Sequence, residues 1–137
     1  MISDRHKLAC SALAGLAATL IGLGLALAGS ARNPSPERLA RQTAQEFFQT
    51  IDARRYERTC DLLARGFYRE NHVRDKARCA LALRIGFTWA PSYRFRIVRV
   101  RVEGARAVVD ALANGAPGRV VLVQEDGQFK VVSVGGR

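Results

Sequence analysis

Around Tyr93 the spacing of the apolar residues changes, and this change constrains the fold more than any other feature of the sequence. Before it, apolar residues recur every three or four positions, which is the period of an α-helix buried on one side. After it, they alternate with polar residues, which is typical of a β-strand with one buried face. Helices followed by strands predict an α+β domain, with about three helices packed on one face of a curved antiparallel sheet.

The first helix is the most strongly patterned one. Ser35 and Pro36 are typical of a helix start, and apolar residues follow at helical spacing from Ala40 to Ile51. A break is expected near Asp52 to Arg55. The other two helices are expected from Tyr56 to near Gly66 and from about Asp75 to Ile85, with Gly86 ending the last one.

Four strands are expected after Tyr93. In the first, the apolar phase slips by one residue between Ile97 and Val98, which predicts a β-bulge. Asp126-Gly127 lies between two alternating runs and predicts a tight hairpin. The remaining connections are expected at Glu103-Gly104 and in a loop from Asn114 to Gly118. The later strands are expected over Arg106 to Leu112, Arg119 to Glu125 and Gln128 to Val134.

The amino-terminal segment has a different character from the rest. Leu8 to Ala31 carries no charged residue, and it is longer than the apolar core of a secretory signal, roughly 7–15 residues. It reaches the length of about 20 residues that spans a bilayer. We expect residues 1–31 to form a retained signal anchor and transmembrane helix, 32–35 a linker, and 36–137 a domain on the extracytoplasmic side of the cell membrane. Gly29-Ser30-Ala31 offers a cleavage site, so a secreted domain is the alternative.

The charge balance restricts the kinds of partner. Of 22 Lys and Arg residues and 12 Asp and Glu residues, all but Asp4, Arg5 and Lys7 follow the apolar run, which leaves a formal charge of about +9. Behind such a leader we expect anionic lipid, cell-wall polymer or an acidic envelope protein as partner, and no nucleic acid. The alternative is a solvated basic surface with no particular partner. The densest basic segment could bind a polyanion or protect a strand from edge pairing. It consists of Arg94, Arg96, Arg99 and Arg101, and the phase slip leaves open whether they share one face.

The two cysteines after the apolar run are Cys60 and Cys79. An even pair in an exported chain predicts a disulfide, here between the second and third predicted helices. It would stabilise the domain by roughly 3 kcal/mol in the chain-entropy model. The alternative is two buried free thiols. Only His72 is near them and no close ligand pair exists, so no metal site is expected, and no cofactor is implied either.

No catalytic residue is assigned from the sequence. His72 could act as a general base beside Glu70 or Asp75, but nothing marks a nucleophile, and a solvated loop histidine is the preferred interpretation. Aromatic residues could line a pocket between helices and sheet, or they could be part of the core. These candidates are Tyr56, Phe67, Tyr68, Trp89 and Tyr93.

Three segments carry a resemblance to a known superfamily. Ala44 to Phe48, Ile51 to Tyr56 and Cys60 to Leu63 resemble the first helix, the break and the second helix of NTF2-like (SnoaL-like, cystatin-like) proteins. In particular the chain resembles small exported or membrane-anchored actinobacterial proteins of the Mce-associated type, in which each of two helices holds one cysteine. The resemblance implies a cone-shaped fold with a pocket at its wide end. It implies no reaction, and no catalytic residue of the superfamily matches a position here.

Three functional hypotheses follow. The first is a membrane-anchored accessory domain that binds envelope proteins and has no catalytic activity, which predicts a filled or narrow pocket. The second is a protein that binds a small apolar molecule, or an enzyme acting on one, which predicts an open pocket lined by the aromatic residues. The third is a binder of anionic envelope lipid or polymer through the basic segment, which predicts strong sensitivity to salt.

Overall fold

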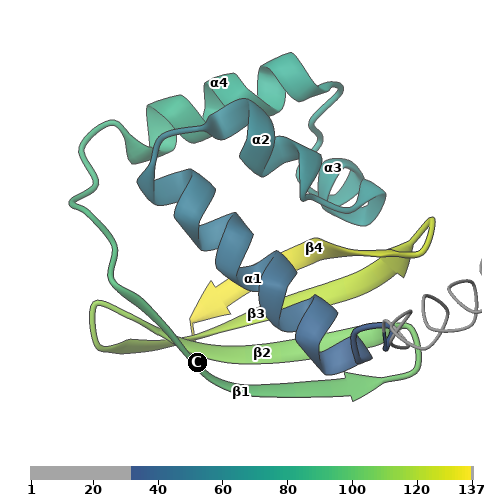
Figure 1. Ribbon diagram of the computed structural model, residues 1–137. Coiled ribbons are helices and arrows are strands. Elements are labelled where there is room, and N and C mark those ends of the chain that lie inside the picture. The colour runs from purple at the N-terminus through teal and green to yellow at the C-terminus, as the bar shows by residue number, and fades with distance from the viewer. Residues whose placement is uncertain (1–31, 137) are drawn as a thin grey trace, which may run out of the picture. The chain divides into compact units, whose positions relative to one another are not determined.

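The structure is a computed structural model that describes residues 32–136, so the predicted anchor and cleavage site lie outside the described residues. Four helices precede four strands, and Figure 1 shows the helices gathered on one side of the sheet. Within residues 32–136, no helix has the length and apolar character needed to span a membrane. The elements are α1 (Pro36–Asp52), α2 (Tyr56–Asp61), α3 (Arg65–Glu70), α4 (Lys76–Phe87), β1 (Phe95–Glu103), β2 (Arg106–Ala113), β3 (Ala116–Glu125) and β4 (Gln128–Gly136).

The first helix forms as its sequence predicts. The Ser35 hydroxyl accepts a hydrogen bond from the Arg38 amide at 3.3 Å, and Pro36 occupies the first turn. Its apolar stripe packs on β1, β2 and β4. We call the face of the sheet that α1 covers the inner face and the opposite one the outer face (Figure 1). α1 ends at Asp52, and Arg54 then adopts a left-handed conformation with φ 58°.

The second predicted helix is two helices, α2 and α3, so its expected span is wrong. The chain between them pairs with β4: the Val131 amide donates to the Leu62 carbonyl, and the Ala64 amide donates to the Val131 carbonyl, both at 2.7 Å. These bonds take up backbone groups that a continuous helix would use internally. Gly66 therefore lies in the first turn of α3 instead of ending a helix. A Cβ there would lie 3.1 Å from Cγ2 of Val132, so glycine permits the close approach of α3 to β4.

α4 begins as predicted but ends later. Asp75 caps it, because its side-chain oxygen accepts a hydrogen bond from the Arg78 amide at 2.8 Å. Gly86 lies inside the helix, contrary to the prediction, and it lacks the left-handed φ that allows glycine to end a helix. The helix ends at Phe87, where the Thr88 hydroxyl donates to the Arg84 carbonyl at 2.5 Å.

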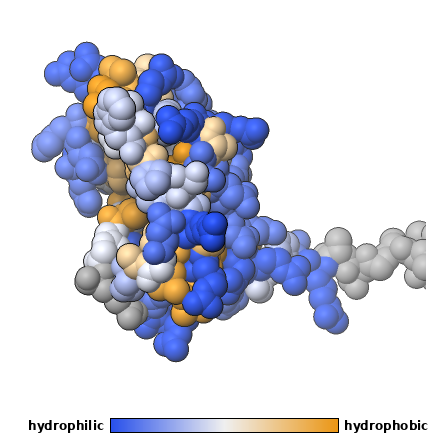
Figure 2. All heavy atoms as spheres, turned by 90° about the vertical axis from the view of Figure 1, so that its left-hand side faces the viewer, coloured by the Kyte–Doolittle hydropathy of each residue, from blue (hydrophilic) through white to orange (hydrophobic). Residues whose placement is uncertain are grey.

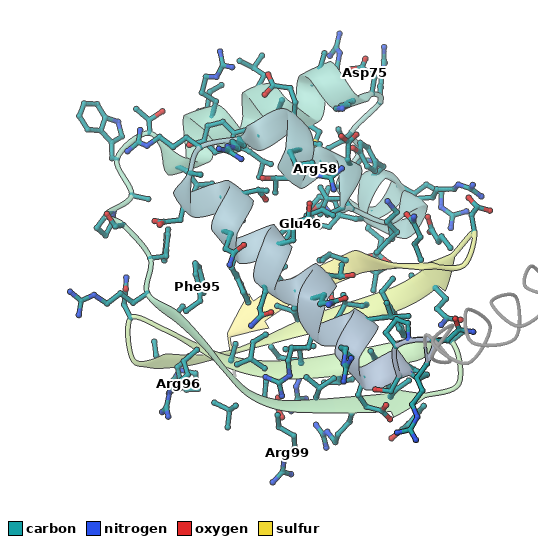
Figure 3. All side chains as sticks on the ribbon, viewed as in Figure 1. Glu46, Arg58, Asp75, Phe95, Arg96 and Arg99 are labelled. Carbon is teal, nitrogen blue, oxygen red and sulfur yellow. A yellow bond between two sulfur atoms is a disulfide. The ribbon has the colours of Figure 1, made fainter. Side chains whose placement is uncertain are left out.

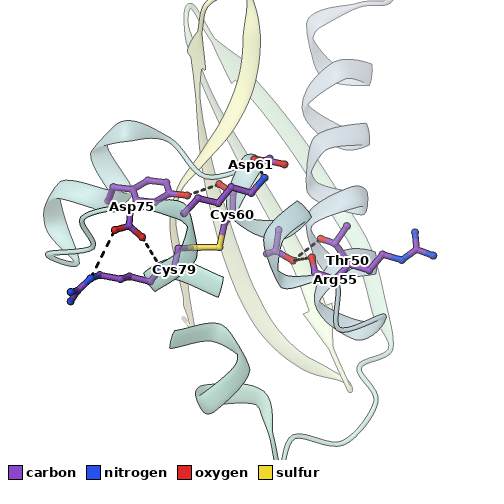
Figure 4. The surroundings of a disulfide bond; sticks show 10 residues. Thr50, Arg55, Cys60, Asp61, Asp75 and Cys79 are labelled. Carbon is purple, nitrogen blue, oxygen red and sulfur yellow. Dashed lines mark hydrogen bonds and ion pairs between the residues drawn. A yellow bond between two sulfur atoms is a disulfide. The ribbon is translucent and has the colours of Figure 1, made fainter. Parts of the chain in front are cut away.

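A disulfide joins α2 to α4, which confirms the predicted cysteine pair. The Sγ atoms of Cys60 and Cys79 are 2.07 Å apart, and both residues are buried (Figure 4). A second buried link joins α2 to α1, where the Thr59 hydroxyl donates to Oγ1 of Thr50 at 2.9 Å. The short helix α2 is thus fixed from two sides, by a covalent bond and by a buried hydrogen bond.

The four strands form an antiparallel meander in the order β1-β2-β3-β4, as expected. The register between β1 and β2 shifts between Ile97 and Arg99, which leaves Val98 as the extra residue and confirms the predicted bulge. A second bulge at Val132 of β4 was not predicted. It follows from the register, because Val121 pairs with Ser133 whereas Leu122 pairs with Val131.

Two hairpins have two-residue turns with positive φ at both positions. Asp126 and Gly127, with φ of 52° and 77°, form the expected one. Asn114 and Gly115, with φ of 49° and 84°, form the other. The loop predicted from Asn114 to Gly118 is therefore wrong, since β3 begins at Ala116. Its proline and glycines indicated a loop, but Asn-Gly alone makes the turn and the rest continues the ladder.

The core lies between α1, α2 and the inner face of the sheet. Its most deeply buried side chains come from all three regions and include Ala44, Cys60, Val109, Leu122 and Val131. α4 contacts α2 and lies further from the sheet. This placement leaves space between α4 and the end of the sheet, where the candidate site lies.

Candidate functional site

A cavity of about 520 Å³ lies between the helices and one end of the sheet. Its floor includes the buried side chains of Ile51, Leu63 and Val120. Its rim includes the exposed residues Asn71 and Val134, so the cavity is open to solvent. This volume is within the range of about 300–1,000 Å³ that is typical of small-molecule sites. Figure 2, which looks onto this end of the domain, shows apolar atoms at its surface.

Five aromatic rings in continuous contact line the cavity. Phe47 and Phe48 of α1 have ring centroids 5.6 Å apart, and Phe48 stacks on Phe95 of β1 at 3.9 Å. Tyr93 stacks on Phe95 at 5.4 Å and meets Phe87 of α4 edge to face at 5.9 Å. Figure 3 shows the Phe95 side chain directed to the helical side of the sheet. The row joins α1, β1 and α4 and offers a large apolar surface to a bound molecule.

Backbone hydrogen bonds fix Tyr93 at the cavity. Its amide donates to Oδ1 of Asp52 at 2.9 Å, which ties the segment before β1 to the end of α1. At the next residue, the Arg94 amide donates to Oδ1 of Asn114, and the Asn114 amide donates to the Arg94 carbonyl, both at 2.9 Å. The Tyr93 ring is therefore held beside Phe95 by contacts to α1 and to the hairpin between β2 and β3.

The structure brings some of the predicted pocket aromatics to the cavity and separates others. Phe67 and Tyr93 line it. Tyr56 is only 4% exposed, and it lines a separate hollow of about 50 Å³. Trp89 lies outside the cavity and is 93% exposed, because it follows the last turn of α4 and points into solvent.

Tyr68 has a structural position instead of a place in the cavity. Its hydroxyl donates to the Cys60 carbonyl at 2.9 Å, next to the disulfide (Figure 4). Burial raises the pKa of Tyr68, and the negative charges of Asp61 and Asp75 raise it further. The hydroxyl therefore stays protonated and keeps its role as a donor that links α3 to α2.

Of the five connected rings that line the cavity, the sequence alone identified only Tyr93 as a candidate. Phe47 and Phe48 fit the apolar stripe of the first predicted helix, and Phe95 fits the alternation of the first predicted strand, so the pattern gives none of them as a pocket residue. Phe87 follows Gly86, where the helix was expected to have ended. A cavity wall and a packed core use the same apolar pattern, so periodicity cannot separate them.

Polar groups occupy few positions around the cavity. Asn71 lies at the rim, and its Nδ2 donates to the Phe67 carbonyl at 2.9 Å. His72 follows it in the exposed turn before α4, with φ of 53°, and does not belong to the lining. Within residues 32–136, no group of three His, Cys, Asp or Glu side chains is placed to hold a metal ion. The arrangement favours non-covalent binding of an apolar body, with any polar end near Asn71.

The bulge at Val98 decides where the predicted basic residues lie. The side chains of β1 that pack against the core are Phe95 and Ile97 before the bulge, and Val100 and Val102 after it. The exposed arginines of β1 that alternate with them share the outer face; they are Arg96, Arg99 and Arg101. Arg94 is exposed just before the strand begins. Figure 3 shows Arg96 and Arg99 pointing away from the helices. We call these four residues the arginine row.

Neighbouring strands extend the charge of the outer face. Asp110 of β2 pairs with Arg101 at 3.4 Å and with Arg119 of β3 at 3.1 Å, and its side chain is only 13% exposed. Arg106 of β2 is exposed on the same face by alternation. β1 is also an edge strand, so protection from edge pairing remains an alternative explanation of its arginines.

Comparisons with known proteins define the fold. No protein-family model and no curated protein matches the sequence. Among solved structures, the chain is similar to a SnoaL-like protein of unknown function from Burkholderia thailandensis, with a TM-score of 0.54, 15% identity, and coverage of 74% of this chain and 95% of that one. It is also similar to a candidate calcium/calmodulin-dependent protein kinase type II association domain from Thiobacillus denitrificans, with a TM-score of 0.51, 16% identity, and coverage of 74% and 93%. The domain therefore has the SnoaL-like, or NTF2-like, fold that the sequence resemblance implied.

Proposed function

We propose that this domain binds a small apolar or amphipathic molecule in its cavity. The observation that carries the proposal is the open space of about 520 Å³ lined by five connected aromatic rings. An accessory domain that acts only through its surface has no need of such a space, and the hypothesis of an envelope-protein partner predicts a filled or narrow one. The apolar ligand is therefore preferred over the accessory role, and binding over catalysis, because the lining carries few polar groups.

Two features support a location outside the cytoplasm. The uncharged run from Leu8 to Ala31 is long enough to anchor the chain in a membrane. A disulfide such as the one between Cys60 and Cys79 is typical of proteins in an oxidising compartment. A cysteine in each of two helices also fits the small exported or anchored Mce-associated type. In this proposal the domain stands at the outer surface of the cell membrane, and secretion after cleavage remains the alternative.

A photoreactive lipid tests the cavity directly. The full chain is placed in bilayers that contain a fatty acid with a diazirine on its alkyl chain, irradiated, and mapped by peptide mass spectrometry. We expect cross-links in α1 and at the start of β1, where Phe48 and Phe95 line the cavity.

A matched pair of variants controls this experiment. Ala113→Phe places a ring in the cavity lining and should abolish these cross-links. Ala77→Phe adds the same ring at an exposed position of α4 and should leave them unchanged. If Ala113→Phe folds with an unchanged melting temperature and labels as strongly as the parent chain, the cavity does not hold the probe and the proposal fails.

The arginine row supports a second candidate function, the binding of an anionic envelope polymer or lipid. The bulge at Val98 keeps Arg99 and Arg101 on the same face as Arg96, and Arg106 and Arg119 extend this positive surface. Binding of polyphosphate or of phosphatidylglycerol vesicles should weaken as salt rises.

Two pairs of arginine substitutions test whether the arginine row carries the binding of the anionic polymer or lipid. The double substitution Arg99→Gln and Arg101→Gln should reduce binding and its salt dependence. Arg38→Gln and Arg41→Gln remove the same charge from the exposed side of α1 and should have a smaller effect. Equal losses for the two pairs would show that net charge alone drives binding, and the arginine row would then have no special role.

A further inference from the structure

The outer side of α4 exposes large apolar side chains at every fourth residue. Leu81 is 55% exposed, Ile85 67% and Trp89, just beyond the helix, 93%. The opposite side of the same helix is also apolar, since Leu83 and Phe87 line the cavity. A helix that is apolar on both sides is normally covered on both sides. Within the described domain, no other element covers the side of α4 that carries Leu81, Ile85 and Trp89.

Positive charge borders this apolar stripe. Arg78 and Arg84 are each three residues from Leu81, so they flank it on the helix surface. Their side chains are 67% and 64% exposed. Each has a carboxylate nearby, Asp75 at 3.9 Å and Glu57 at 3.6 Å. Such exposed ion pairs are weak in water, so both guanidinium groups can turn to another anion.

We propose that the outer side of α4 binds the surface of an anionic bilayer, with Leu81, Ile85 and Trp89 inserted among the lipid headgroups. An apolar stripe bordered by cations and ending in tryptophan has the composition of helices that lie in the membrane interface. The positive charge of residues 32–137 adds a general attraction to anionic lipid. This interaction surface is separate from the proposed cavity function and does not depend on it.

A second copy of the chain fits this surface less well. Three large side chains supply too little area for a stable dimer, which buries about 1,200–2,000 Å² in total. A two-fold contact through α4 would also bring Arg78 and Arg84 of both copies together, and their like charges would repel. A lipid surface needs no complementary shape and supplies negative charge.

Trp89 makes the proposal measurable, because it is the chain's single tryptophan. The full chain is placed at one copy per lipid nanodisc, with phosphatidylcholine alone or mixed with phosphatidylglycerol. In discs with anionic lipid, Trp89 emission should shift to shorter wavelength and be quenched by brominated acyl chains. High salt or the removal of phosphatidylglycerol should reverse most of both effects.

Further substitutions test whether the quenching of Trp89 depends on the apolar side chains of α4. Leu81→Gln with Ile85→Gln should abolish most of the quenching. Val98→Gln changes an equally exposed apolar residue on β1 and should not alter it. Ala113→Phe, which places a ring in the cavity lining, should leave Trp89 quenching intact, so a failure of the cavity function would not affect this result.

Three results would overturn the proposal. One is Trp89 emission that stays solvent-like and unquenched in anionic discs. Another is an equal loss of quenching in Val98→Gln and in the double variant of α4. The third is shielding of Trp89 only when several copies share a disc, which would mean that a second copy covers α4 instead of lipid.

Discussion

α1 and α4 both border the cavity, but they are held in place by different means. α1 buries a continuous apolar stripe on three strands of the sheet. α4 buries only Cys79 and Ala80, contacts α2, and is joined to it by the disulfide. One wall of the cavity therefore belongs to the core, whereas the other is held by the disulfide and by the partly buried side chains of Leu83 and Phe87. Burial of apolar area stabilises the wall formed by α1, whereas the disulfide stabilises the wall formed by α4 by constraining the unfolded chain. Substitutions can therefore weaken each wall separately.

The largest expected effect comes from the wall that belongs to the core. Phe48→Ala removes a buried ring that stacks on Phe95, and should lower the free energy of unfolding by about 3–5 kcal/mol. Because the ring also borders open space, the lower end of that range is expected. Urea denaturation measures the loss. Gln42→Ala, on the exposed side of α1, should change stability by less than about 0.5 kcal/mol.

The next effect concerns the covalent fastening of α4. Replacing Cys60 and Cys79 together by serine should cost about 3 kcal/mol, because the unfolded chain regains the entropy of the closed loop. Hydrogen exchange followed by mass spectrometry should show protection lost first in α4 and retained in α1. Equal loss of protection in both helices would contradict the contrast between the two walls.

A smaller effect is expected at Tyr68, whose hydroxyl is hydrogen-bonded to α2 beside the disulfide. Tyr68→Phe removes the hydrogen bond to the Cys60 carbonyl and should cost about 1 kcal/mol near neutral pH. Since the pKa of Tyr68 is raised on folding, the parent chain keeps this contribution below the unfolded pKa of about 10 and loses it as pH rises through the higher folded value. Denaturation curves between pH 8 and 11 should therefore converge for the two chains as pH rises. A constant difference across that range would argue against the shift.

The smallest effect should stabilise α4 alone. Gly86→Ala removes a flexible residue from the helix, and a Cβ there meets no atom within 4 Å. We expect a gain of about 0.5–1 kcal/mol in the free energy of unfolding. Ala82→Gly, at an exposed position of the same helix, should cost a similar amount. A destabilising Gly86→Ala would indicate that the end of α4 needs the freedom of glycine.

Local patterns predicted the elements well where one rule decided the outcome. The cap at Ser35, the bulge at Val98 and the turn at Asp126-Gly127 each follow from a few neighbouring residues. The cysteine pair was predicted differently, from the even number of cysteines after the apolar run. Prediction failed where a distant segment took part. The sequence from Leu62 to Ala64 fits a helix, but in the structure this segment pairs with Val131 of β4. Nothing in the sequence near residue 63 predicts that pairing.

The cavity was the least predictable feature for the same reason. Phe67 and Tyr93 were among the predicted residues, but Trp89 was placed with them only because it is aromatic and close in sequence. Whether an apolar side chain fills a core or borders a space depends on how far the helices stand from the sheet. That distance is set by α2, by the disulfide and by the link between Asp52 and Tyr93 together.

The extra residue at Val98 has a consequence for how related sequences should be compared. Deleting it would leave a regular ladder in which Ile97 still pairs with Ala111 and Arg99 with Asp110, so later residues of β1 would keep the faces that they have now. A relative that lacks this residue can therefore keep the same order of polar and apolar residues on both sides of the gap. A one-residue gap at this point of an alignment, with the later polar and apolar pattern unchanged, would therefore mark a first strand that has lost its bulge and the bend that the bulge gives.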